Sequence, residues 1–151
     1  MGQIVLSEVM FDLPGPDSPN EFVEIFNLSD KTVDLAGWQI RDKTSTDELT
    51  DTGNGTVLNG RSYAVILEGD YESDNGLYDN LIPDSVIVLK VDDKSIGNQL
   101  STSDSLFIIN SSGTALDSVA WTDIFTPGFS LERLFLERES TVSNWATSFD
   151  S

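Results

Sequence analysis

The stretch EFVEIFN (residues 21–27), followed after a short polar turn by LAGWQIRD (residues 35–42), decides the fold. In the first segment Val23 and Ile25 alternate with glutamate and phenylalanine, which is typical of a strand with one face in a core. In the second segment a glycine leads directly into Trp38, and a buried indole contributes strongly to the stability of a β-sandwich. We therefore predict two neighbouring strands that place Val23, Ile25 and Trp38 in the core.

Strand-like segments recur in the first half of the chain, with turn residues between them. Residues 4–10 are rich in apolar side chains, and simple alternation places Val5 and Val9 on one face. Residues 57–67 contain an Asn-Gly turn between two apolar segments, so they predict a hairpin-like step. The polar residues 42–55 predict a loop or a hairpin at the edge of a sheet.

The second half of the chain has the same character. Residues 86–91 predict an apolar strand, and residues 105–121 predict a hairpin around a turn at residues 110–113. Residues 130–139 suit a strand or a helical turn equally well. Helical periodicity is weak elsewhere, and we count about nine to eleven short strands separated by turns, a pattern typical of a sandwich.

Three blocks of sequence, taken in order, carry a family resemblance. The first joins SEVM to EFVEIFN and LAGWQIRD, the second is VLNGRSYAVIL (residues 57–67), and the third is IGNQLSTSDSLFIINSSGTALDSVAW (residues 96–121). In this order they resemble the lamin tail domain, and the closing SLER and SNWATS are similar to the extended form in bacterial and archaeal members. The resemblance implies an all-β fold, an immunoglobulin-like antiparallel β-sandwich. We expect one such domain over residues 1–151, with an acidic loop or insertion at about residues 68–84.

The resemblance also implies a class of function. In animal lamins the module follows a coiled-coil rod and serves protein interactions at the nuclear lamina, but this chain has no heptad rod. Prokaryotic members are often modules of secreted or surface proteins, and the family has no agreed catalytic residues. We therefore expect a non-catalytic protein-interaction or structural module of a larger prokaryotic surface or secreted protein. The sequence names neither its protein partner nor its oligomeric state.

The chain carries a formal net charge of −18, from 26 acidic and 8 basic residues. Proteins that bind nucleic acid cluster lysine and arginine against the phosphates, so we expect no nucleic-acid binding by this domain alone. No apolar run reaches the roughly 18–20 residues of a membrane helix, so we expect no membrane insertion. The same negative charge attracts cations.

Histidine and cysteine are absent from the sequence. Their absence removes the most common general base, the most common zinc ligand, the Ser-His-Asp triad and disulfide bonds. We expect no enzymatic activity, no catalytic residues and no cofactor other than the calcium candidate below. No signal-peptide pattern precedes residues 4–10, and Met1-Gly2 is typical of a domain cut from a longer chain, which we expect to be extracellular or at the cell surface.

Oxygen ligands for calcium are dense in the segment DYESDNGLYD (residues 70–79). The candidate ligands begin with the alternation of an EF-hand loop and comprise Asp70, Glu72, Asp74 and Asp79. The EF-hand pattern then fails, because Gly76 comes one place late and Leu81 stands where the final glutamate belongs. Two interpretations stay open, a solvated acidic loop and a weak calcium site that orders it. A calcium-dependent adhesion or carbohydrate-binding β-sandwich is the alternative function.

Carboxylates from different strands can also come together. Glu21 and Glu24 are three apart on one strand and point to opposite faces, so they form no same-strand pair. A pair such as Glu8 with Glu24 is open geometrically, although a glycosidase would need both carboxyl groups in a cleft. Arg133, in an acidic chain, predicts an ion pair with a carboxylate such as Glu24 or Glu132.

Overall fold

The computed structural model describes residues 3–11, 20–71, 76, 78–97, 100–101, 103–122 and 129–147 of the 151-residue chain. Within these ranges the chain forms strands and a short 3₁₀ helix, and no helix there is long and apolar enough to cross a membrane. The elements are β1 (Ile4–Met10), β2 (Phe22–Asn27), β3 (Val33–Asp34), β4 (Gln39–Arg41), β5 (Thr46–Asp51), β6 (Val57–Leu58), β7 (Tyr63–Leu67), β8 (Ile87–Val91), β9 (Asp104–Ile109), β10 (Ala115–Trp121), β11 (Leu131–Arg133), η1 (Val142–Asn144) and β12 (Trp145–Thr147).

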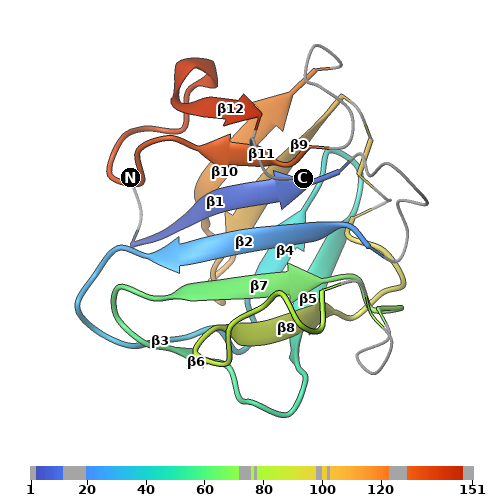
Figure 1. Cartoon of the computed structure of the whole chain (residues 1–151), viewed down its shortest axis with the longest axis vertical. Coiled ribbons are helices and arrows are strands. Elements are labelled where there is room, and N and C mark those ends of the chain that lie inside the picture. Colours follow the sequence, from blue (N-terminus) through green and yellow to red (C-terminus); the bar gives the residue numbers. More distant parts are fainter. Residues whose placement is uncertain are drawn as a thin grey trace.

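Ten strands form one long sheet in the order β10-β9-β4-β5-β8-β7-β2-β1-β11-β12, and β3 pairs with β6 separately. Neighbours are antiparallel except β7 and β8, which run parallel. The sheet curls into two layers, with β1, β2 and β7 in front of β4, β9 and β10 in Figure 1. Across the curl the Leu6 N–H of β1 donates to Asp117 Oδ2 of β10 at 2.8 Å. The predicted all-β, immunoglobulin-like antiparallel β-sandwich is confirmed.

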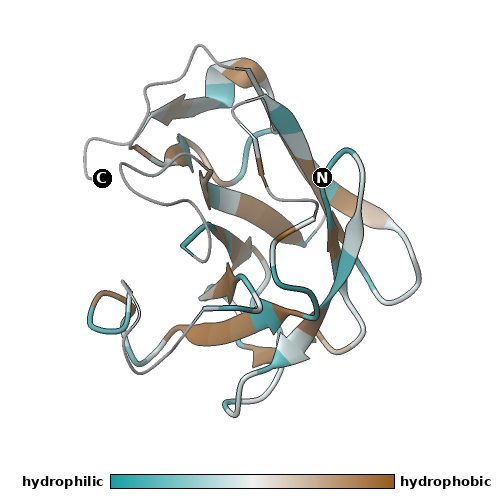
Figure 2. Cartoon of the chain, turned by 90° about the vertical axis from the view of Figure 1, so that its right-hand side faces the viewer, coloured by the Kyte–Doolittle hydropathy of each residue, from teal (hydrophilic) through white to brown (hydrophobic). Residues whose placement is uncertain are grey.

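The main core lies between the two layers. Val23 and Ile25 are fully buried and Trp38 is 6% exposed, so the predicted core positions are confirmed. Ile40 of β4 and Ile108 of β9 join the same cluster from the other layer. In Figure 2 the strands carry most of the hydrophobic colour and the turns most of the hydrophilic colour. The alternation along each strand therefore assigns one face to this core and the other to the outside.

A β-bulge in β1 changes the predicted assignment of faces. The register between β1 and β2 shifts between Leu6 and Glu8, so one extra residue interrupts the alternation. Leu6 and Val9 both join the main core, whereas Val5 lies opposite Phe26 on the outer face. The prediction that Val5 and Val9 share a face is therefore wrong, and the bulge turns Glu8 outward.

Two predictions about strand pairing are also wrong. Residues 57–67 form no hairpin, because β6 pairs with β3 while β7 pairs with β2 and β8. Residues 42–55 supply the turn and the second strand of a hairpin with β4, as predicted, but β5 lies between β4 and β8 and not at an edge. The polar sequence TDELTD obscures this position, although Asp47 and Leu49 are buried. The predicted hairpin of β9 and β10 is confirmed, and residues 130–139 contain the strand β11.

Candidate functional site

The predicted calcium ligands do not come together as a group in the described part of the chain. Asp70 and Asp79 are both exposed, and Glu72 and Asp74 lie outside the described residues. Among the residues that the structure describes, no three acidic side chains are arranged to hold a metal ion. The calcium site therefore stays a prediction. A comparison of melting temperatures in millimolar Ca²⁺ and in a chelator would test it, because an ion that binds the folded state raises its stability.

Asp79 has a structural role of its own. Its Oδ1 accepts a hydrogen bond from the Tyr71 hydroxyl at 2.9 Å, and its Oδ2 accepts the Gly76 N–H at 2.9 Å. The Tyr71 oxygen in turn accepts the Tyr78 N–H at 2.7 Å, and the two tyrosine rings stack with their centroids 5.9 Å apart. Burial raises the pKa of Tyr71 to about 12, so the hydroxyl keeps its proton and donates to Asp79 at neutral pH.

A second apolar cluster lies under this loop, on the outer face of β7 and β8. Val65, Leu67 and Tyr71 are its buried members, and we call it the outer cluster. Beside it is a pocket of about 730 Å³, within the usual size range of ligand sites. Its lining comes from the turn after β5, from the loop before β8 and from β7 and β8, and includes Thr52, Asn54, Leu67, Asp79, Asp84 and Val88.

Three glutamates stand in a row across neighbouring strands on the outer face. Glu24 of β2 and Glu132 of β11 are both register partners of Glu8 in β1, and directly opposed cross-strand partners share a face. We call these three residues the glutamate row. Ser7 Oγ donates to Glu24 Oε1 at 2.7 Å, and Ser130 Oγ donates to Glu8 Oε2 at 2.5 Å.

Burial and mutual repulsion disfavour ionisation in this row. Burial raises the pKa of Glu24 to about 7, the hydrogen bond from Ser7 opposes the rise, and the charges of Glu8 and Glu132 add to it. Burial likewise raises the pKa of Glu8. A carboxyl of raised pKa beside a second carboxylate suits glycoside hydrolysis only within a cleft, and the pocket by the outer cluster is lined by other residues. The structure thus joins Glu8 and Glu24, the pair that the sequence left open, and adds Glu132, which sequence reasoning missed.

Arg133 points to the opposite face of β11. Its side chain is buried, and Nη1 donates to Asp117 Oδ2 at 2.6 Å and to the Leu6 carbonyl at 3.0 Å. The predicted ion pair with a carboxylate is confirmed, but the partner that the structure shows is Asp117 and not the suggested Glu24 or Glu132. Consecutive strand residues point to opposite faces, so Arg133 and Glu132 cannot meet across the strand. The pairing with Asp117 joins the C-terminal hairpin to β10 and β1.

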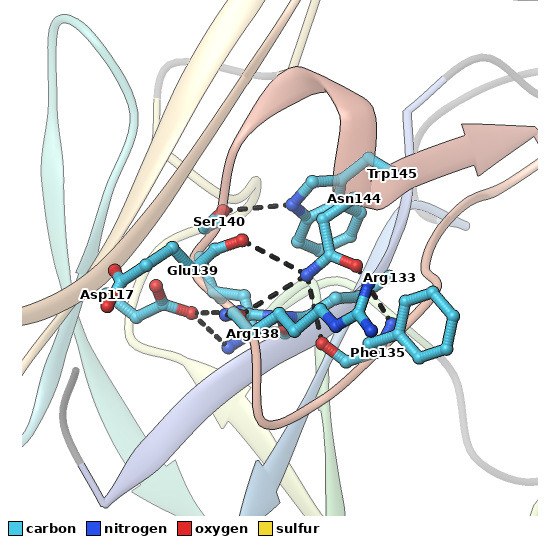
Figure 3. A network of polar contacts seen from close by, with 9 residues as sticks. Asp117, Arg133, Phe135, Arg138, Glu139, Ser140, Asn144 and Trp145 are labelled. Atoms are coloured by element: carbon cyan, nitrogen blue, oxygen red, sulfur yellow. Dashed lines mark hydrogen bonds and ion pairs between the residues drawn. The ribbon is translucent and has the colours of Figure 1, made fainter.

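Asn144 fixes the loop between β11 and β12, as Figure 3 shows. Its Nδ2 donates to the carbonyls of Phe135 at 2.9 Å and Glu139 at 3.1 Å, and its Oδ1 accepts the Phe135 N–H at 2.9 Å. Nδ2 also donates to the Arg138 carbonyl at 3.3 Å. Sequence reasoning missed this role, because an asparagine in SNWATS gives no sign of which earlier carbonyls it reaches. One side chain thus satisfies several backbone groups that a loop would otherwise leave to water.

The loop that Asn144 fixes presents apolar side chains to solvent. Leu134, Phe135 and Val142 are 52%, 51% and 73% exposed, and we call these three residues the hairpin tip. The Arg138 guanidinium lies 4.2 Å from the centroid of the Phe135 ring, which holds the ring against the loop. The hairpin tip is therefore an exposed apolar surface on a backbone that hydrogen bonds have already ordered.

Comparison with protein families gives a match over most of the chain. The family model of the Lamin Tail Domain matches residues 1–123 of the chain. The matched part contains β1 to β10, the pocket and two residues of the glutamate row, whereas Glu132, Arg133 and the hairpin tip lie beyond it. No curated protein matches the chain.

Proposed function

Because the chain belongs to the lamin tail domain family, we propose that it is a non-catalytic module that binds another protein. Immunoglobulin-like sandwiches commonly present loops on a rigid framework, and such loops are where partners bind. The sequence also contains no histidine and no cysteine, so no serine or threonine hydroxyl has a histidine base beside it. Both properties support binding over catalysis.

The hairpin tip is the observation that carries the proposal. Leu134, Phe135 and Val142 are each more than half exposed, so the loop between β11 and β12 carries three large apolar side chains outside the core. Apolar side chains exposed together on a surface often mark a protein-binding site. Hydrogen bonds from Asn144 order the loop before any partner arrives, and a pre-ordered loop loses less conformational entropy on binding.

A photo-crosslinking experiment in the full-length gene product tests the proposal. A photoreactive amino acid would replace Val142 in the hairpin tip, and in a matched variant it would replace Val57, which is 51% exposed on β6. We expect one crosslinked protein from position 142 and none from position 57. The identified protein, purified, should then bind the wild-type module at least about tenfold more tightly than Phe135→Ser, since a central aromatic contact is worth about 1.4 kcal/mol or more.

Two results would contradict this function. Equal crosslinking from both positions would indicate non-specific contact with exposed apolar residues. Unchanged affinity of Phe135→Ser for the purified protein would place the contact elsewhere. Phe135 takes part in the hydrogen bonds to Asn144 through its backbone and not through its side chain, so the substitution leaves the loop hydrogen bonds in place.

We also propose that the module works within a larger prokaryotic surface or secreted protein. The resemblance of SLER and SNWATS to the extended bacterial and archaeal form supports this, as does a net charge of −18, which keeps an exposed domain soluble. Protease treatment of intact cells tests it. We expect release of fragments containing residues 1–151 before the cells lyse, and protection until lysis would contradict an exposed location.

A further inference from the structure

We propose that the pocket beside the outer cluster binds an extended basic segment of a partner protein. Aliphatic parts of the segment would lie on the pocket floor, and a lysine or arginine would face its acidic wall. This surface differs from the hairpin tip and does not rest on the function proposed for that tip. In Figure 1 the hairpin of β11 and β12 lies at the top, while β8 lies toward the bottom.

The floor of the pocket is apolar. Leu67 of β7 and Val88 of β8 lie on the outer face of the sheet, and Ile82 and Val86 pack onto the same cluster from the loop before β8. Leu67 itself is only 1% exposed, so the floor is continuous with a packed interior. Such a floor suits methylene groups, which gain about 0.8 kcal/mol for each one buried.

The two walls are held by hydrogen bonds. On one side Thr52 Oγ1 donates to the Val88 carbonyl at 2.6 Å, and Asp51 Oδ1 accepts the N–H groups of Gly53 and Gly55 at 2.7 Å and 2.9 Å. The wall is therefore joined directly to the strand that makes the floor. A pocket formed in advance binds without first having to order its own loops.

The opposite wall is fixed in the same way. The Ile82 N–H donates to the Tyr78 carbonyl at 3.2 Å, and the Val86 N–H donates to the Pro83 carbonyl at 3.0 Å. Asp79 accepts the Tyr71 hydroxyl at 2.9 Å, which ties this loop to the outer cluster. Backbone turns on both sides thus shape the pocket.

The charges around the pocket select the partner. Asp79 and Asp84 line it, and none of its described lining residues is basic. Asp84 is exposed, and its carboxylate makes no hydrogen bond to the residues that the structure describes. Lys90 of β8 does not line the pocket, and its Nζ donates to the Tyr71 carbonyl. A pocket whose described lining residues carry only acidic charges, in a chain of net charge −18, favours a cation over a neutral or anionic ligand.

Size and polarity together point to an extended peptide. A volume of about 730 Å³ exceeds what one side chain fills, so several residues can enter. Lysine and arginine place a long aliphatic stem on apolar surface while the charged end stays near water or an acid. A segment that alternates basic and aliphatic residues would therefore match both the floor and the acidic wall.

Calorimetric titration of the whole chain tests the proposal. The probe is a capped hexapeptide of alternating leucine and lysine, and the control probe alternates serine and lysine with the same charge. Asn54→Lys puts a cation into the pocket lining, and Asn59→Lys makes the same change of net charge at an exposed site outside it. Titrations at about 0.15 M salt screen the general acidic field.

We expect the leucine–lysine peptide to bind the wild-type chain and Asn59→Lys alike. Asn54→Lys should weaken binding by about tenfold or more, and the serine–lysine peptide should bind the wild-type chain about tenfold more weakly. Absence of binding, equal weakening by the two substitutions, or equal binding of the two peptides would overturn the proposal. Binding of a neutral hexasaccharide in place of the peptide, blocked by Asn54→Lys, would also overturn it and assign the pocket to carbohydrate.

Discussion

Neighbouring residues of β11 place opposite charges in opposite surroundings. Arg133 points inward, is 7% exposed and has Asp117 Oδ2 at 2.6 Å from Nη1. Glu132 points outward and stands opposite Glu8, whose other cross-strand partner is Glu24. The interior therefore pairs Arg133 with the carboxylate of Asp117, whereas three carboxyl groups lie side by side on the outer face, where serine hydroxyls donate to two of them.

The difference shows what each surrounding allows. An unpaired charge in the interior costs several kcal/mol, because water cannot solvate it there, so the buried Arg133 depends on its carboxylate partner. On the outer face a carboxyl group can take up a proton when ionisation is disfavoured, and burial, with a smaller contribution from the charges of Glu8 and Glu132, raises the pKa of Glu24 in this way. The ion pair of Arg133 with Asp117 thus joins the C-terminal hairpin to the strands that match the family model, while the glutamate row makes stability depend on pH.

Breaking the ion pair of Arg133 with Asp117 should have the largest effect on stability. Arg133→Met keeps most of the side-chain volume but leaves Asp117, whose side chain is 8% exposed, as a buried charge without its cation. We expect the free energy of unfolding to fall by about 3–5 kcal/mol, measured by chemical denaturation at neutral pH.

A double variant separates the lost attraction from the charge left behind. Arg133→Met combined with Asp117→Asn removes the remaining charge and still offers an oxygen to the Leu6 N–H. It should recover about 1–2 kcal/mol of the loss. A loss below about 1 kcal/mol in the single variant would show that the pair does not hold the hairpin.

Removing the hydrogen bonds of Asn144 should have the next largest effect. Asn144→Ala leaves the Phe135 N–H and several loop carbonyls without their side-chain partner, so we expect a loss of about 2 kcal/mol. Hydrogen exchange at the Phe135 amide should become faster in the variant. Ser143→Ala is the control, because that hydroxyl is exposed and interacts with the Thr141 hydroxyl at 3.1 Å. Equal losses in both variants would refute a special role for Asn144.

Local sequence patterns predicted much of the fold, but they did not predict the different surroundings of Arg133 and Glu132 on the two faces of β11. Alternation in β2 identified Val23 and Ile25 as core residues, since a regular strand repeats every two residues. The bulge after Leu6 inverted the face assignment within β1, and no residue type marks it. The partner of Arg133 was missed for another reason, because Asp117 lies on a strand that approaches β11 only after the sheet has curled. Long-range pairing of this kind is not encoded in any single window.

Neutralising the glutamate row should change how stability depends on pH. The pKa of Glu24 is raised from 4.5 to about 7, so the folded chain holds this proton more tightly than the unfolded chain. The resulting stability is fully present below about pH 4.5 and is lost as the pH rises to about 7. Glu24→Gln imitates the protonated carboxyl, so it should leave stability unchanged near pH 4 and raise it at pH 8 by about 1–2 kcal/mol.

Denaturation curves across this pH range provide the measurement. Some pH dependence should remain in Glu24→Gln, because burial raises the pKa of Glu8 as well. Glu48→Gln, at an exposed position of β5, is the control for replacing a carboxylate by an amide. If Glu24→Gln is less stable than wild type at pH 8, burial and the neighbouring charges do not disfavour ionisation of Glu24 in the folded chain.

The smallest effect should come from an ion pair of the same chemistry at the surface. Arg61 Nη2 lies 3.5 Å from Glu137 Oε1, but the two side chains are 51% and 67% exposed, compared with almost complete burial of Arg133. Water solvates both groups with or without the contact, so Glu137→Gln should change the free energy of unfolding by no more than about 0.5 kcal/mol. Measured beside Arg133→Met, this variant isolates burial as the variable, since both pairs join an arginine to a carboxylate. A loss similar to that of Arg133→Met would mean that the hairpin is held from its exposed side, and the contrast between the two faces of β11 would no longer account for its attachment.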